Sequence, residues 1–274
     1  MMGGHHAASG AAAWVAIAST GPYTLGWYPL DAAGILIGGM ATAGTALVLD
    51  WDHRHSTVAQ SLPPLSNIIA VGIENASGGH RQGTHSLLGG AFFVVLAMVA
   101  GQIQLHTDWG ILSVGAGVLC MFLINIAAKA LKLFPKSGWI TNWLFALTMA
   151  GLVTWFAPDQ WTWLPVSMLT GVVVHIVGDM ITTGGVPLLW PVVIKPPKFL
   201  RKLPLVKDVW KANGAFSIPL LGRAGSRREW LVLIPVSAYA MVGMCVAAWA
   251  LGNVHFPAAL AFGSSFMNTL LGTG

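Results

Sequence analysis

Long apolar runs with almost no charged residues dominate this sequence, and they limit its fold more than any other feature. Of the 274 residues, 55% are hydrophobic and only 8% are charged. A soluble domain carries about 25% charged residues, so this chain has too few charges to cover a water-facing surface. Lipid must therefore surround most of it. We expect an all-α fold, a polytopic bundle of transmembrane helices.

The apolar runs divide the chain into seven or eight expected spans of roughly 17 to 25 residues. We treat 1–274 as one transmembrane domain with a motif-bearing core (1–191), a basic cytoplasmic loop (192–229) and C-terminal spans (230–274). Small residues between Gly34 and Gly44 would allow close packing of helices, within the chain or between copies in a homo-oligomer. The expected spans cover roughly residues 7–28, 32–49, 86–105, 110–131, 139–157, 163–181 and 230–251, and 256–271 is a shorter stretch that either spans the membrane or lies on it.

The basic residues predict the orientation of these spans. All fourteen lysines and arginines fall at Arg54, at Arg81, over 129–136 and over 195–228. If the spans alternate, all these stretches share one side, which the positive-inside rule makes the cytoplasm. We expect a multi-pass protein of the plasma (inner) membrane, with the N-terminus in the cytoplasm. This topology explains the net charge of +5, and no nucleic-acid recognition motif accompanies it.

The basic, proline-rich loop over 195–229 has two interpretations. It lies against anionic lipid headgroups as a topology signal, or it is a lid that holds an anionic headgroup near an active site. Both interpretations make membrane lipids partners of the chain.

The first polar motif, DWDH over 50–53, follows the second expected span directly. Asp50, Asp52 and His53 offer the oxygen and nitrogen ligands that suit zinc, manganese or another divalent ion. A polar helix end at headgroup level would explain one such residue but not three together. Ser56 follows closely and is a candidate for binding substrate.

The second motif, HRQGTHS over 80–86, opens the third expected span. His80 and His85 are candidate metal ligands, and the positive end of the helix would keep His85 in the neutral form that binds metal. Arg81 has a planar fork suited to a phosphate or carboxylate. Thr84 or Ser86 could cap the helix, and Thr84 is also a candidate for binding substrate.

The third motif lies inside the sixth expected span, near its cytoplasmic end. His175 and Asp179 are four residues apart and share one helix face, so both can point at one ion. Asp179 could instead orient a ligating histidine. Ionisable residues inside a span are costly, so a functional role is the default interpretation. His6, ahead of the first span, lies on the same side of the membrane.

Together these segments predict a metal site at the cytoplasmic membrane face. Eight candidates suffice for two ions, or for one ion and a general base. Zinc is the favoured metal, as one or two ions, with manganese as the alternative. The predicted catalytic base is His53, or else one of the carboxylates. The predicted metal ligands are His6, Asp50, Asp52, His80, His85, His175 and Asp179.

The three motifs and the early histidine also occur in a known order. DWDHRHST, HRQGTHSLLG and HIVGDMITTGGVPLLWP resemble the YdjM-type family of membrane-bound, metal-dependent hydrolases, LexA-regulated inner-membrane proteins. The resemblance extends from residue 5 to about residue 191 and implies a hydrolase without defining its substrate. One departure is the pair His5-His6, where a single histidine is expected, so the ligand is one of the two, with His6 favoured.

Two functions from different classes fit these residues. The first is a membrane-bound, metal-dependent hydrolase that cleaves a phosphoester or lipid with metal-activated water at the cytoplasmic leaflet. Arg81 would hold the non-bridging oxygens. The second is a divalent-metal transporter or sensor without hydrolytic activity. A transport path needs ligands near the bilayer midplane, so candidates at one end favour the hydrolase.

Overall fold

The computed structural model describes residues 1–135, 138–156 and 162–255, and helices make up most of them. Three short 3₁₀ turns, η1 (Leu49–Asp52), η2 (Gly83–His85) and η3 (Leu200–Lys202), lie between the longer elements. The helices are α1 (Gly3–Ala18), α2 (Ala32–Val48), α3 (Leu65–Ser77), α4 (Leu87–Gln102), α5 (Val114–Ala130), α6 (Trp139–Phe156), α7 (Trp163–Met180), α8 (Pro204–Val209) and α9 (Arg227–His255).

Three segments within the described part of the chain are long and apolar enough to cross a membrane: Ala32–Asp52, Trp163–Met180 and Arg227–Asn253. Helices α4 and α5 are apolar but shorter. The expected total of seven or eight spans therefore stays a prediction, and the stretch 256–271 lies outside the described residues.

Several expected boundaries were wrong. Helix α1 ends at Ala18, well before the expected limit near residue 28, because Ser19 is extended and the chain turns at residues 21–23, where Tyr23 has a positive φ of 69°. The loop over 50–85 contains an unpredicted helix, α3, which ends at Gly78 in the left-handed conformation that glycine favours.

The expected all-α fold also needs a correction between α4 and α5. Strands β1 (Leu105–Thr107) and β2 (Gly110–Leu112) form an antiparallel hairpin there. The hairpin forms because Gly110, with φ of 129°, adopts the backbone turn that the connection requires, and the Thr107 hydroxyl donates to the Gly110 carbonyl at 2.9 Å.

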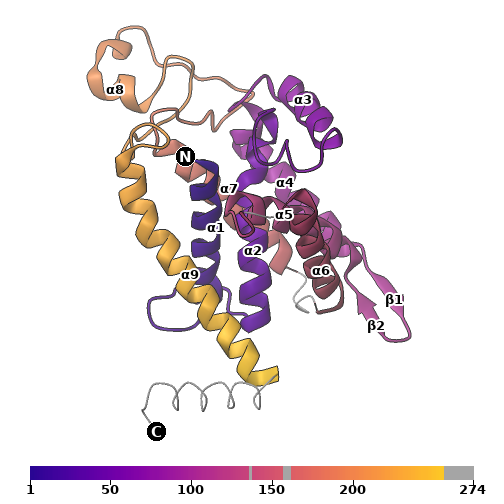
Figure 1. The fold of residues 1–274 in the computed structure, drawn as a ribbon. Coiled ribbons are helices and arrows are strands. Elements are labelled where there is room, and N and C mark those ends of the chain that lie inside the picture. The colour runs from indigo at the N-terminus through magenta and orange to yellow at the C-terminus, as the bar shows by residue number, and fades with distance from the viewer. Residues whose placement is uncertain (136–137, 157–161, 256–274) are drawn as a thin grey trace.

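Helix α2 forms the centre of the bundle and packs against α1, α5, α7 and α9 (Figure 1). Its glycines permit this close packing. A Cβ at Gly38 would lie 2.2 Å from the Trp14 ring, and one at Gly44 would lie 2.0 Å from the Leu123 carbonyl oxygen. Small residues at helix interfaces are the usual means of close approach in a membrane, where helices gain little from apolar burial alone.

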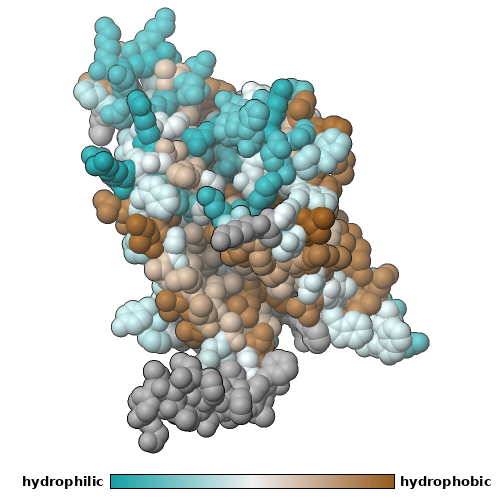
Figure 2. Space-filling model, viewed as in Figure 1, coloured by the Kyte–Doolittle hydropathy of each residue, from teal (hydrophilic) through white to brown (hydrophobic). Residues whose placement is uncertain are grey.

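Polar and apolar surfaces separate along the length of the bundle. On the face shown in Figure 2, hydrophilic residues gather at the end that carries the N-terminus, α3 and α8, and apolar residues form a band across the middle (Figures 1 and 2). The apolar band is what a lipid-facing surface requires, and the hydrophilic end contains the segments with the predicted site residues. The fold therefore delivers the polar motifs to one end of the bundle.

Candidate metal centre

Four side chains from three separate segments converge where α2 and α7 end. Asp50 comes from η1, His85 from η2, and His175 and Asp179 from α7. The two imidazole Nε2 atoms lie 3.1 Å apart. Asp50 Oδ1 is 3.5 Å from Nε2 of His85 and 3.8 Å from Nε2 of His175, and Asp179 Oδ2 is 3.6 Å and 3.7 Å from the same two atoms.

These distances fit a divalent metal ion. Around a tetrahedral zinc ion with bonds of about 2.0 to 2.2 Å, ligand atoms lie about 3.3 to 3.6 Å apart. The five distances measured among the four donors range from 3.1 to 3.8 Å. Two imidazole lone pairs that face each other repel unless a proton or a cation lies between them. The donor set and its spacing therefore suit a bound cation.

Hydrogen bonds fix both histidines in the orientation that metal binding needs. His175 Nδ1 donates to the Ala46 carbonyl at 2.6 Å, so Nε2 keeps its lone pair toward the cluster. His85 Nδ1 lies 2.9 Å from the Thr84 hydroxyl and 3.3 Å from Asp52 Oδ2. Such a partner on the far nitrogen is the usual support of a metal-ligating histidine.

Asp52 was predicted as a metal ligand, but both of its carboxylate oxygens accept hydrogen bonds from neighbouring groups. The carboxylate is fully buried and accepts hydrogen bonds from the Thr84 hydroxyl, from His80 Nδ1 at 2.8 Å and from the Arg81 amide at 3.0 Å. Asp50, Asp52 and His80 still form a second group whose ligand atoms lie within 4.8 Å of one another. Asp50 belongs both to this group and to the group of Asp50, His85 and His175, so it is a potential ligand in either one.

Asp179 divides its two oxygens between different tasks. Oδ1 accepts from the Arg81 guanidinium at 3.0 Å, from His6 Nε2 at 3.2 Å and from the Met1 amino group. Oδ2 is buried and has no hydrogen-bond partner among the described residues, and it faces the two imidazoles. A buried carboxylate oxygen without a hydrogen-bond partner, beside two imidazole nitrogens, is the observation that best shows that these residues fit a divalent cation.

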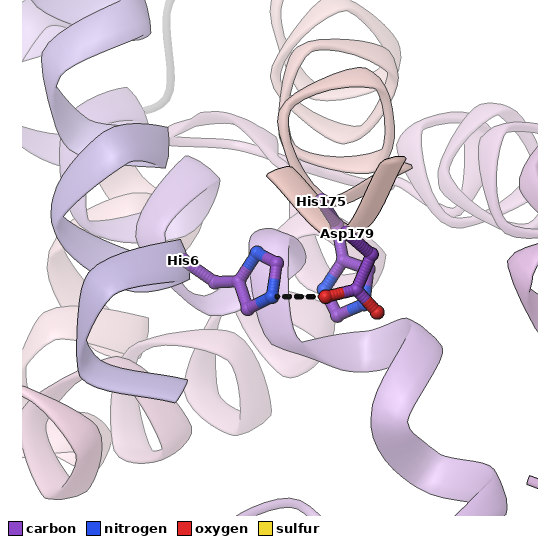
Figure 3. A group of neighbouring side chains, drawn as sticks. All are labelled: His6, His175 and Asp179. Carbon is purple, nitrogen blue, oxygen red and sulfur yellow. Dashed lines mark hydrogen bonds and ion pairs between the residues drawn. The ribbon is translucent and has the colours of Figure 1, made fainter. Parts of the chain in front are cut away.

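Histidines 5 and 6 take different directions from α1. The His6 ring stacks on His175 at 3.9 Å, next to Asp179 (Figure 3). His5 Nδ1 instead lies 2.5 Å from the Glu229 carboxylate at the start of α9. His6, His175 and Asp179 form a third group of potential ligands, so His6 is the member of the pair that belongs to the cluster.

The pKa of His85 reflects its two carboxylate neighbours. Burial alone would lower the pKa, but Asp50 and Asp52 stabilise the charged imidazole and raise the pKa to about 9. The prediction that the helix start keeps His85 neutral is therefore wrong for the metal-free protein, because the two carboxylates favour the protonated imidazole at neutral pH. A metal ion would take the place of that positive charge.

A polar pocket of about 270 Å³ opens beside the donors. His53 is exposed in this pocket and stacks on His80 at 4.6 Å, and its pKa lies below the ordinary value because of desolvation and the neighbouring His80. Ser56 also lines the pocket. Thr84 was predicted to bind substrate or cap a helix, but it is buried against Asp52 and His85 instead. Ser86 caps α4.

Arg81 is held against the cluster by its backbone and by a glycine. Its φ of 59° is unusual for a residue with a side chain and indicates a conformation that the surroundings enforce. A Cβ at Gly184 would lie 2.1 Å from Arg81 Nη1, so only glycine there leaves room for the guanidinium to reach Asp179. The turn after α7 thus positions Arg81, which also lines the polar pocket.

Two members of this region were missed from the sequence. Glu229 is fully buried and accepts from the Met2 amide at 2.9 Å and the Gly225 amide at 2.8 Å, besides pairing with His5. The lone acid at the start of an apolar helix was the available signal. The Ala46 carbonyl, which accepts from His175, could not be predicted from the sequence, because any residue type has a backbone carbonyl that can accept this hydrogen bond.

The fold and the cluster define a helical membrane protein with a buried His/Asp group able to hold a divalent metal ion. Comparison with known families agrees with this class. The model of the YdjM inner membrane protein family matches residues 1–128 and 141–250, so the chain belongs to that family, as its motifs predicted. No curated protein and no solved structure matches the chain.

Proposed function

We propose that this protein is a membrane-bound, metal-dependent hydrolase that cleaves a phosphoester at the cytoplasmic leaflet. The observation that carries the proposal is the convergence of Asp50, His85, His175 and Asp179 next to a polar pocket lined by Arg81. Membership in an inner-membrane family supports the location. The cytoplasmic orientation rests on the distribution of basic residues.

The donor set favours zinc, as one or two ions, with manganese as the alternative. Imidazole nitrogens and carboxylate oxygens suit both metals. A divalent ion held by these residues would supply Lewis acidity toward water and toward a phosphoryl oxygen. Asp50, shared between two of the donor groups, supports a site with two ions.

The remaining pocket residues suit the other tasks of phosphoester hydrolysis. Arg81 keeps guanidinium N–H groups beside the pocket in addition to the one bound to Asp179, and these can hold phosphate oxygens. His53 is exposed in the pocket, and its lowered pKa keeps the imidazole neutral and able to accept a proton from water. Ser56 is placed to hydrogen-bond the substrate.

The placement of the cluster favours a hydrolase over a metal transporter or sensor. All three groups of potential ligands among the described residues belong to this one cluster, at the hydrophilic end of the bundle. A transport path needs binding groups near the midplane and access from both faces. A catalytic site needs access from one side only.

The test is to purify the protein in detergent, measure bound metal by mass spectrometry, and assay a soluble phosphodiester and a phospholipid. The double variant His85→Ala, Asp179→Ala should lose both metal and turnover. His106→Ala, on the exposed hairpin, is the matched control and should retain both. Turnover that survives intact in the double variant would refute the proposal, and metal uptake into proteoliposomes that depends on His175 would favour the transporter.

A further inference from the structure

A second cavity, distinct from the polar pocket, lies between α1, α7 and α9. It is a groove of about 700 Å³ with an almost entirely apolar lining. Ser9 and Tyr239 are the polar side chains of the lining, and both carry only a hydroxyl. The groove is lined by residues 1, 9, 12, 13 and 16 of the N-terminal segment, 173, 174, 177, 178 and 181 around α7, and 221, 232, 233, 235, 236 and 239 in and before α9.

Small side chains on α1 create this groove. Ser9, Ala12, Ala13 and Ala16 face α7 and α9 across it, and none is large enough to fill the space. The stretch from residue 9 to residue 16 covers on the order of 10 Å of helix, and the α9 lining from 232 to 239 covers a similar length. The groove therefore extends along the helices into the apolar band.

One end of the groove adjoins the candidate metal centre. Met1 lines both the groove and the polar pocket. Gly178, in the groove wall, precedes Asp179 directly, and a Cβ at this position would lie 3.0 Å from Cε1 of His6. A molecule in the groove thus has its upper end beside the ligand cluster, and the adjoining pocket contains the guanidinium of Arg81.

The groove also opens toward the surface that faces lipid. Helix α9 is the least buried of the three segments long enough to span a membrane, because only 17% of its most apolar 18-residue stretch is buried. Val232, in the groove wall, is 47% exposed, and its neighbour Ile234 is 59% exposed. An apolar groove that opens on an apolar surface excludes water and accepts hydrocarbon.

We propose that this groove holds an acyl chain of the substrate, so that the substrate is a lipid with a phosphoester headgroup. The inference rests on the proposed function for the headgroup end and on the groove for the acyl end. The two ends of the site match the two ends of such a lipid. The Arg81 guanidinium and the potential metal ligands lie at the polar end, and a hydrocarbon-lined groove continues from it into the apolar band.

The test fills the groove without touching the ligand cluster. Ala13→Phe places a ring on the groove floor, and Val232→Trp fills it from α9 as a second variant. Ala238→Phe, on the exposed side of α9 outside the groove, is the matched control. The probes are a phosphatidic acid with a photoreactive diazirine in its acyl chain, presented in detergent micelles, and soluble bis(p-nitrophenyl) phosphate.

Both groove variants should show about tenfold weaker cross-linking to the diazirine lipid, the effect of losing contact with about two methylene groups. They should lose long-chain lipid turnover in the same proportion and keep turnover of the soluble diester. The control should match the unmodified protein in all three measurements. Size-exclusion profiles identify any variant that fails to fold, and the other groove variant then decides the result.

Other outcomes overturn the inference, and they separate it from the proposed function. Equal cross-linking in groove variants and unmodified protein would show that the chain binds elsewhere. An equal loss in Ala238→Phe would show that the effect is not specific to the groove. Absence of turnover with either ester in the unmodified protein, while Ala13→Phe still blocks cross-linking, would refute the hydrolase and the substrate role but leave the groove as a lipid-binding site.

Discussion

Replacing Thr84 with valine tests whether this residue orients the metal centre or binds substrate. The substitution keeps the shape of the side chain and removes only the hydroxyl. That hydroxyl donates to Asp52 and lies 2.9 Å from His85 Nδ1, so its loss releases the ring that presents Nε2 to the ion. Removing such a supporting partner usually costs about 10- to 100-fold in metal affinity.

The structure places the expected loss near the lower end of that range. Asp52 keeps hydrogen bonds from His80 Nδ1 at 2.8 Å and from the Arg81 amide at 3.0 Å, so its buried charge is not left unpaired. His85 Nδ1 remains 3.3 Å from Asp52 Oδ2. We therefore expect the Kd for zinc to rise about tenfold, which is a loss of about 1.4 kcal/mol in binding free energy.

The assay is competition between the protein in detergent and a fluorescent zinc chelator. Thr45→Val is the matched control, because Thr45 is also fully buried and its hydroxyl donates only within its own helix, to the Ala41 carbonyl at 2.9 Å. The control should bind zinc normally. An unchanged Kd in Thr84→Val together with reduced turnover would refute the orienting role and restore the interpretation of Thr84 as a substrate-binding residue.

Four further predictions follow from the same geometry. Gly184→Ala should lower turnover roughly 10- to 100-fold because the added methyl group displaces the Arg81 guanidinium. The circular dichroism spectrum should stay unchanged. A normal rate would show that catalysis does not depend on the position of this guanidinium. Zinc affinity, followed by titration calorimetry, should rise from about pH 6.5 to about pH 8.5, because His85, with its pKa raised to about 9, loses its proton to admit the ion. Gly44→Ala should destabilise the protein by about 1 to 3 kcal/mol because its Cβ would meet an α5 carbonyl at 2.0 Å, whereas Gly151→Ala, with open space around it, should not; thermal unfolding measures both. Stripping the metal with a chelator should lower the Tm, since an ion at about 1,000 times its Kd stabilises by about 4 kcal/mol.

The sequence was sufficient to predict that the polar motifs would meet. The alternation of apolar runs and the positions of the basic residues predict that His6, His85 and Asp179 lie at the same end of the bundle. The i, i+4 spacing also placed His175 and Asp179 on one helix face, as the structure has them. These are properties of spacing, which a sequence states directly.

The separate role of each of these residues could not be predicted from the sequence. Whether a carboxylate faces an ion or supports a histidine depends on side-chain positions that differ by an ångström or two. Asp50 and Asp52 are two residues apart, yet one faces the imidazole nitrogens and the other accepts three hydrogen bonds. Helix α3 and the hairpin at 105–112 were missed because neither has the long apolar run on which the spans were predicted.

The donors of the cluster come from parts of the chain that are far apart in sequence, and this has a consequence for assembly. His85 and His175 are 90 residues apart, and His6 and Asp179 are 173 apart. An ion held among them would act as a cross-link that closes long loops, which removes conformational freedom from the unfolded chain. Since α7 contributes two of the donors, a chain synthesised only as far as α6 could not hold the ion. Metal uptake would then mark the packing of α7 against the preceding segments, and the metal content of a preparation would measure how much of it has assembled that far.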